Sequence, residues 1–175
     1  MVRAQPARVA RLRPRRLRTV PHRFEYAQAE EIRDAFARHG VRYLFIGKSG
    51  AILLGFPDTT QDADLYVEKT PANCSSLVKA LTDLGFPLTE TESDEVLRGK
   101  DFIQLKNGPF DLDLVFAPDG IERFADAWRR HVDVEGFPVC HPDDIIASKT
   151  AAKRVKDRES LPRLIAFRDY WKARR

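Results

Sequence analysis

Residues 43–67 read YLFIGKSGAILLGFPDTTQDADLYV. A hydrophobic run enters the glycine turn Gly47-Lys48-Ser49-Gly50, and a short apolar segment leads to an acidic pair, Asp62 and Asp64. Alternate residues of a strand point to the same face, so we expect both carboxylates to lie side by side at one edge. Two like charges held this close repel each other unless a cation lies between them. Mg²⁺ is the usual occupant of such oxygen-only sites.

The glycine turn predicts a phosphate-binding element, because a turn at the start of a helix presents backbone N–H groups to an anion. The turn and the carboxylate pair together indicate metal-assisted chemistry on a nucleotide. Gly47-Lys48-Ser49 also fits the end of the phosphate-loop motif G-x-x-x-x-G-K-[ST], but position 42 is arginine rather than glycine. The sequence therefore argues against an NTPase of the phosphate-loop class.

A second acidic strand is expected at 110–116, where Asp111 and Asp113 alternate with Leu112 and Leu114. One face of this strand is apolar and the other carries both acids. If it lies beside the Asp62/Asp64 strand, three or four carboxylates converge, as a two-metal phosphoryl-transfer site requires. We expect Asp113 to be the third ligand and Asp111 to cap the hairpin or face solvent.

The remaining pattern interleaves helices with strands. Apolar spacing, turn residues and caps predict helices over 24–39, 49–54, 71–84, 119–130, 142–154 and 157–172. They predict strands over 41–46, 61–68, 101–106 and 110–116, with a short hairpin at 132–139. Asn107-Gly108 is a strong hairpin signal, and we expect 89–99 to be an irregular loop or weak strand. The order predicts an α/β (α+β) fold, a mixed sheet flanked by helices, with a C-terminal helical cap.

Charge divides the chain into two parts. Eight of its 30 basic residues are arginines within 1–23, which contain no acid, so the 26 acidic residues outnumber the basic ones in the rest. We expect 1–23 to be a disordered basic arm and 24–175 to be a single domain. The arm is open to three interpretations: an unstructured extension, a contact to nucleic-acid phosphates, or a transit peptide. No apolar run is long enough to span a bilayer, which favours a cytoplasmic protein without a membrane partner.

In order along the chain, these motifs resemble the nucleotidyltransferase superfamily of the DNA polymerase β type. The superfamily has a strand, a Gly-Gly or Gly-Ser turn, a helix, Asp-x-Asp on the next strand and a later aspartate. The nearest subgroup in pattern is the bacterial AbiEii-like toxin branch, which 58–64 (DTTQDAD) resembles, as do 143–149 (DDIIASK) and 154–157 (RVKD). The resemblance covers about residues 41–160.

The resemblance implies an Mg²⁺-dependent enzyme, with two ions, that moves a nucleoside monophosphate from an NTP to a hydroxyl acceptor. It implies that Asp62, Asp64 and Asp113 are catalytic metal ligands. Nucleotide-binding residues would be Gly47, Lys48, Ser49, Gly50 and Lys149. The acceptor could be RNA, a protein or a small molecule, and a cognate antitoxin protein is a possible partner.

The chain departs from the superfamily pattern at two positions. Lys48 stands where the second glycine or serine of the turn is usual, and Asp58 stands where the subgroup often has arginine. Lys48 would either contact a nucleotide phosphate or be a solvated side chain. These departures motivate an alternative, a non-catalytic nucleotide-binding or partner-binding protein on the same scaffold. A second alternative is a nucleic-acid-binding protein whose affinity resides in 1–23.

Overall fold

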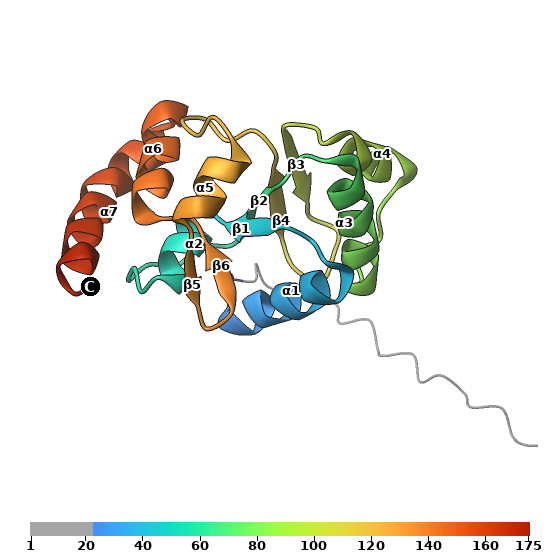
Figure 1. Cartoon of the computed structure of the whole chain (residues 1–175), viewed down its shortest axis with the longest axis horizontal. Helices are drawn as coiled ribbons and strands as arrows, with labels where there is room; N and C mark the ends of the chain where they lie inside the picture. The colour runs from blue at the N-terminus through green and yellow to red at the C-terminus, as the bar shows by residue number, and fades with distance from the viewer. Residues whose placement is uncertain (1–22) are drawn as a thin grey trace, which may run out of the picture.

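The computed structural model describes residues 23–175, so the predicted arm lies outside the described residues apart from Arg23 (Figure 1). The strands are β1 (Tyr43–Phe45), β2 (Ala63–Val67), β3 (Phe102–Leu105), β4 (Leu112–Val115), β5 (Val132–Val134) and β6 (Phe137–Val139). The helices are α1 (Tyr26–His39), α2 (Gly47–Leu53), α3 (Pro71–Asp83), α4 (Glu90–Arg98), α5 (Phe124–Arg130), α6 (Pro142–Ala152) and α7 (Val155–Ala173).

The strands form one mixed sheet in the order β3-β4-β2-β1-β6-β5. The central strand β2 runs antiparallel to β1 and parallel to β4. Both predicted hairpins are present, since β3 pairs antiparallel with β4 and β5 with β6. Strands separated in sequence therefore meet at the centre of the sheet.

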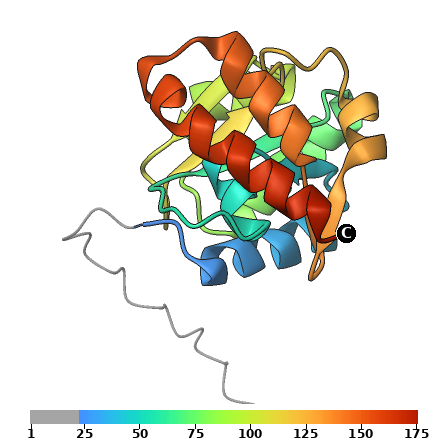
Figure 2. The ribbon, with the colours of Figure 1, turned by 90° about the vertical axis from the view of Figure 1, so that its left-hand side faces the viewer.

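Helices cover both faces of the sheet, and the alternation of side chains along each strand divides the core in two. On β1, Tyr43 and Phe45 face the core shared with α1, α3 and α4. Leu44 and Ile46 face the second core, which contains residues of α2, α5, α6 and α7. The C-terminal helices α6 and α7 pack side by side over this second face (Figure 2).

The prediction for 89–99 was wrong, because this segment forms the helix α4. Thr89 and Glu92 form a capping box at its start, and Gly99 ends it in the left-handed conformation. These local signals outweigh the polar composition, which alone suggests a loop. The predicted helix after Asp119 begins later, at Phe124.

The fold class is confirmed: a mixed α/β sheet flanked by helices, with a helical C-terminal part. None of the helices within 23–175 has the length and apolar character needed to cross a membrane.

Candidate active site

One cavity of about 440 Å³ opens on the sheet face that α6 and α7 cover. Its wall combines the start of the glycine turn, the start of β2, the strand β4 and the connection between α6 and α7. The charged lining residues are Lys48, Asp62, Asp64, Asp101, Asp113, Asp119, Lys149, Arg154, Lys156 and Asp157. Carboxylates and cations thus share one concave surface.

Asp64 and Asp113 are direct neighbours across the parallel pair β2–β4. Asp62 lies in the bend before β2, and it faces the same cavity as Asp64. All three aspartates predicted as metal ligands line the cavity. Asp113 is buried, with 8% of its surface exposed, whereas Asp62 and Asp64 are partly exposed.

Burial and mutual repulsion raise the pKa of two of these carboxyl groups. The pKa of Asp64 is raised to about 7, chiefly by burial and then by the charge of Asp113. The pKa of Asp113 is raised to about 6, chiefly by burial and then by the charge of Asp62. Lys149 and Lys156 act in the opposite direction on Asp64. The ionised pair is therefore unfavourable unless a cation offsets it.

The aspartate carboxylates of the cavity suit an Mg²⁺ ion that is bound by substrate phosphates as well. Within 23–175, no three His, Cys, Asp or Glu side chains stand close enough to hold a metal ion by themselves. Mg²⁺ in nucleotide enzymes is usually bound by one or two carboxylates together with substrate phosphates and water. Asp64 and Asp113 provide such a carboxylate pair, with Asp62 beside it.

The glycine turn is built around the backbone of Asp64. The Ser49 hydroxyl accepts a hydrogen bond from the Asp64 N–H at 2.9 Å and donates one to the Ile46 carbonyl at 3.1 Å. Gly47 has a φ of 63°, and a Cβ atom there would lie 2.7 Å from Asp64 Oδ2. The turn therefore needs glycine at 47 both for its conformation and for the close approach to Asp64.

Of the four predicted turn residues, only Gly47 and Lys48 line the cavity. Ser49 and Gly50 are buried behind it. A Cβ atom on Gly50 would lie 2.9 Å from the Phe45 carbonyl oxygen, so this glycine permits close packing of α2 against β1. The structure thus places Ser49 and Gly50 where they support the turn rather than at its exposed surface.

Two lysines at the cavity form ion pairs with aspartates. Lys48 Nζ lies 3.4 Å from Asp58 Oδ2, and both side chains are partly exposed. Lys149 Nζ donates a hydrogen bond to Asp157 Oδ1 at 2.9 Å, with only 14% and 6% of these two side chains exposed. Asp157 therefore holds the Lys149 ammonium group in the cavity wall.

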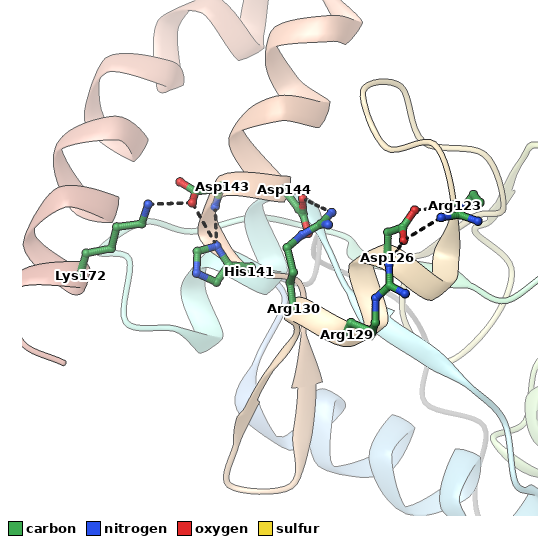
Figure 3. A network of polar contacts seen from close by, with 8 residues as sticks. All are labelled: Arg123, Asp126, Arg129, Arg130, His141, Asp143, Asp144 and Lys172. Atoms are coloured by element: carbon green, nitrogen blue, oxygen red, sulfur yellow. Dashed lines mark hydrogen bonds and ion pairs between the residues drawn. The ribbon is translucent and has the colours of Figure 1, made fainter.

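A polar network anchors α6, the helix that carries Lys149 (Figure 3). Arg130 of α5 binds Asp144 with two hydrogen bonds, at 3.1 and 2.9 Å. Lys172 of α7 donates to Asp143 at 2.7 Å. The His141 ring accepts from the Asp143 N–H and so caps α6. These contacts attach α6 to both neighbouring helices.

Sequence reasoning missed Asp157, Asp101, Asp119 and Phe102 as lining residues. Phe102 is 40% exposed although it is aromatic, and it lines the cavity from the edge strand β3. An exposed aromatic side chain in a polar cavity offers a flat apolar surface. Asp157 belongs to the segment 154–157 (RVKD) noted above, but no short motif marks the other three, because the topology brings them to the cavity.

No family model matches the chain, and no curated protein sequence does either. Six chains of solved structures match. One is a crystal structure of the lincosamide antibiotic adenylyltransferase LnuA with lincomycin bound, which has a TM-score of 0.57 and 14% sequence identity. The match covers 80% of this chain and 96% of that one. It shows that the fold is similar to that of a nucleotidyltransferase, as expected. The AbiEii-like branch stays a prediction.

Proposed function

We propose that this chain is an Mg²⁺-dependent nucleotidyltransferase that moves a nucleoside monophosphate from an NTP to a hydroxyl acceptor. The observation that carries the proposal is the register of Asp64 against Asp113, with Asp62 beside them, in one cavity. The fold shared with an adenylyltransferase supports it. Two bound Mg²⁺ ions would stabilise charge on the reacting phosphorus and on the leaving pyrophosphate.

The three aspartates would have distinct tasks. Asp62 and Asp64 would hold the ions, and Asp113 would complete the set and orient the attacking hydroxyl. The hydroxyl oxygen forms a bond to the α-phosphorus while the bond from that phosphorus to the bridging oxygen breaks. Pyrophosphate leaves, and the hydroxyl proton passes to water. Gly47 keeps the Asp64 carboxylate free of steric contact during these steps.

The cations of the cavity would bind the triphosphate. The positive charges of Lys149 and Lys156 reach Asp64, where they oppose the rise in its pKa, and the same charges would attract the phosphates. Lys48 would add a further contact, together with the N–H groups of the turn. The exposed ring of Phe102 would stack on the nucleotide base, a contact worth about 1–3 kcal/mol per base.

The biological setting that we propose is a toxin–antitoxin pair, with RNA as acceptor and a cognate antitoxin protein as partner. Support comes from the AbiEii-like segments 58–64 and 143–149. In the structure, the first segment leads into the Asp62/Asp64 pair, and the second is the part of α6 that ends at Lys149.

The Lys48–Asp58 ion pair favours the alternative of a non-catalytic nucleotide-binding protein, because it occupies a lysine otherwise available to phosphate. A pyrophosphate-release assay with Mg²⁺, each NTP, total RNA and cell lysate separates the two. Release that depends on an acceptor supports the transferase. NTP binding without release under any of these conditions supports the alternative.

A further inference from the structure

The connection between α6 and α7 concentrates cationic side chains. Within 153–158 (KRVKDR), Lys153, Arg154, Lys156 and Arg158 are all exposed. Arg154 has a weak ion pair to Asp157, at 3.9 Å, and the other three form none within the described residues. By contrast, most arginines and lysines elsewhere in 23–175 are paired with acids. The segment 153–158 therefore presents four exposed cations, and one of them, Lys156, also acts electrostatically on Asp64 and Asp113.

Two further features set this basic segment apart. Val155 has 72% of its surface exposed, more than any other large apolar residue within 23–175. Lys153 ends α6 with a φ of 54°, and only one other non-glycine residue in the described chain, Glu135, has a positive φ. This left-handed conformation is a common way to end a helix, and here it separates α6 from α7. An apolar side chain between cations suits a ligand that presents both phosphates and bases.

The basic segment lies at the rim of the cavity that contains the aspartates. Arg154 and Lys156 line the cavity, whereas Lys153, Val155 and Arg158 do not. Arg158 follows Arg154 by four residues and so lies on the same side of α7. The positive surface thus continues from the cavity wall to the outside of the protein.

We propose that the basic segment 153–158 binds the phosphate backbone of a single-stranded nucleic acid and directs its terminal hydroxyl to the cavity. The proposal rests on the nucleotidyl transfer proposed above and names its acceptor surface. A triphosphate would be bound inside the cavity and has no need of Lys153 and Arg158, which lie outside it. A longer polyanion that extends from the cavity would contact them, and charge complementarity favours it over a cationic or neutral acceptor.

The test measures the binding of a short, fluorescein-labelled single-stranded RNA to the full-length protein at several salt concentrations. The variant is Lys153→Glu/Arg158→Glu. The matched control is Lys79→Glu/Arg98→Glu, which makes the same charge change at exposed residues of α3 and α4, on the opposite side of the molecule (Figure 1). Residues 1–22 are unchanged in all three proteins.

We expect the Lys153/Arg158 variant to bind RNA about tenfold more weakly and the control to bind like the wild type. The slope of log K against log salt should be shallower by about 1.4 in the variant, for two lost phosphate contacts. Binding of Mg·ATP, followed by thermal shift, should be unchanged. Equal RNA affinity in variant and control would overturn the proposal. Loss of Mg·ATP binding in the variant would do so too, because it would assign the segment to the nucleotide.

RNA binding is measured without turnover, so the result does not depend on catalysis. If no NTP supports transfer but the Lys153/Arg158 variant alone loses RNA binding, the proposed reaction fails and the acceptor surface stands. If transfer occurs but RNA binding is the same in all three proteins, the reaction stands and the acceptor is of another class, such as a protein.

Discussion

Lys48 and Asp58 form an ion pair, with Lys48 Nζ 3.4 Å from Asp58 Oδ2. These are the two positions at which the sequence departs from the nucleotidyltransferase pattern. Asp58 also accepts a hydrogen bond from Arg163 of α7, at 3.3 Å. The two departures are therefore coupled in space, and an arginine of α7 contacts the same aspartate.

This coupling predicts opposite effects for two substitutions. Asp58→Asn should release Lys48 and Arg163 and tighten Mg·NTP binding about threefold, the usual size of a partly exposed ion pair. Lys48→Ala should weaken the same binding. Isothermal titration with each NTP measures both. If neither substitution changes the affinity, Lys48 is only a solvated side chain.

Gly47→Ala should abolish transfer, because the new Cβ atom would lie 2.7 Å from Asp64 Oδ2 in addition to the strain of a positive φ. Gly40→Ala is the matched control, since Gly40 has a similar φ of 66° but nothing within 4 Å of the added atom. Both variants should lose about 1 kcal/mol of stability from strain. Only Gly47→Ala should also lose activity, by a factor of about 100 or more. Similar activity losses in both would argue against a special role of Gly47.

The metal-free protein should become less stable as the pH rises. The pKa of Asp64 is about 7 in the folded state against an ordinary value of 3.8, so the folded state binds the proton more tightly. The free energy of unfolding should therefore fall between about pH 4 and pH 7. Asp64→Asn cannot ionise, and near pH 8 it should exceed the wild type in stability by about 2 kcal/mol.

Chemical denaturation with EDTA, at about pH 4 and about pH 8, measures this difference. Mg·ATP added near pH 8, without EDTA, should stabilise the wild type and have little effect on Asp64→Asn. Parallel pH profiles for the two proteins would show that Asp64 ionises without penalty in the fold.

Asp157→Asn should destabilise the protein by about 3 kcal/mol, because it leaves the buried Lys149 ammonium group without its charged partner. The same variant should raise the KM for NTP more than it lowers kcat, since Lys149 would lose its position in the cavity wall. Denaturation and steady-state kinetics measure these quantities. Lys149→Met/Asp157→Leu removes both charges and should recover most of the stability but none of the NTP affinity. Recovery of both would assign the pair a structural role alone.

Much of the fold was predictable because its signals are local. Glycine turns, capping residues and alternating apolar positions marked nearly all elements, including both hairpins. The wrong prediction of a loop or weak strand at 89–99 was avoidable, since Thr89 and Glu92 form a capping box that is visible in the sequence. The prediction gave the polar composition more weight than this capping box. A capped helix needs few apolar residues, and in α4 Val96 is the buried one.

The sequence predicted that the carboxylates converge only if the two acidic strands lie side by side. Alternation along 110–116 identified Asp113, but its place beside Asp64 depends on the parallel pairing of β2 with β4, which no local pattern specifies. The burial of Ser49 and the Lys149–Asp157 pair were not foreseen for the same reason. Each depends on which elements the topology brings together, and that is decided by packing across the whole sheet.

The most direct test of the account is label transfer from each α-labelled NTP, with Mg²⁺ and with total RNA and cell lysate as acceptors. The wild type is compared with Asp64→Asn and with Asp94→Asn, a matched substitution at an exposed residue of α4. We predict a labelled product for the wild type and Asp94→Asn, and its loss in Asp64→Asn. A product that persists in Asp64→Asn, or its absence from wild type that binds Mg·NTP, would contradict the proposed function.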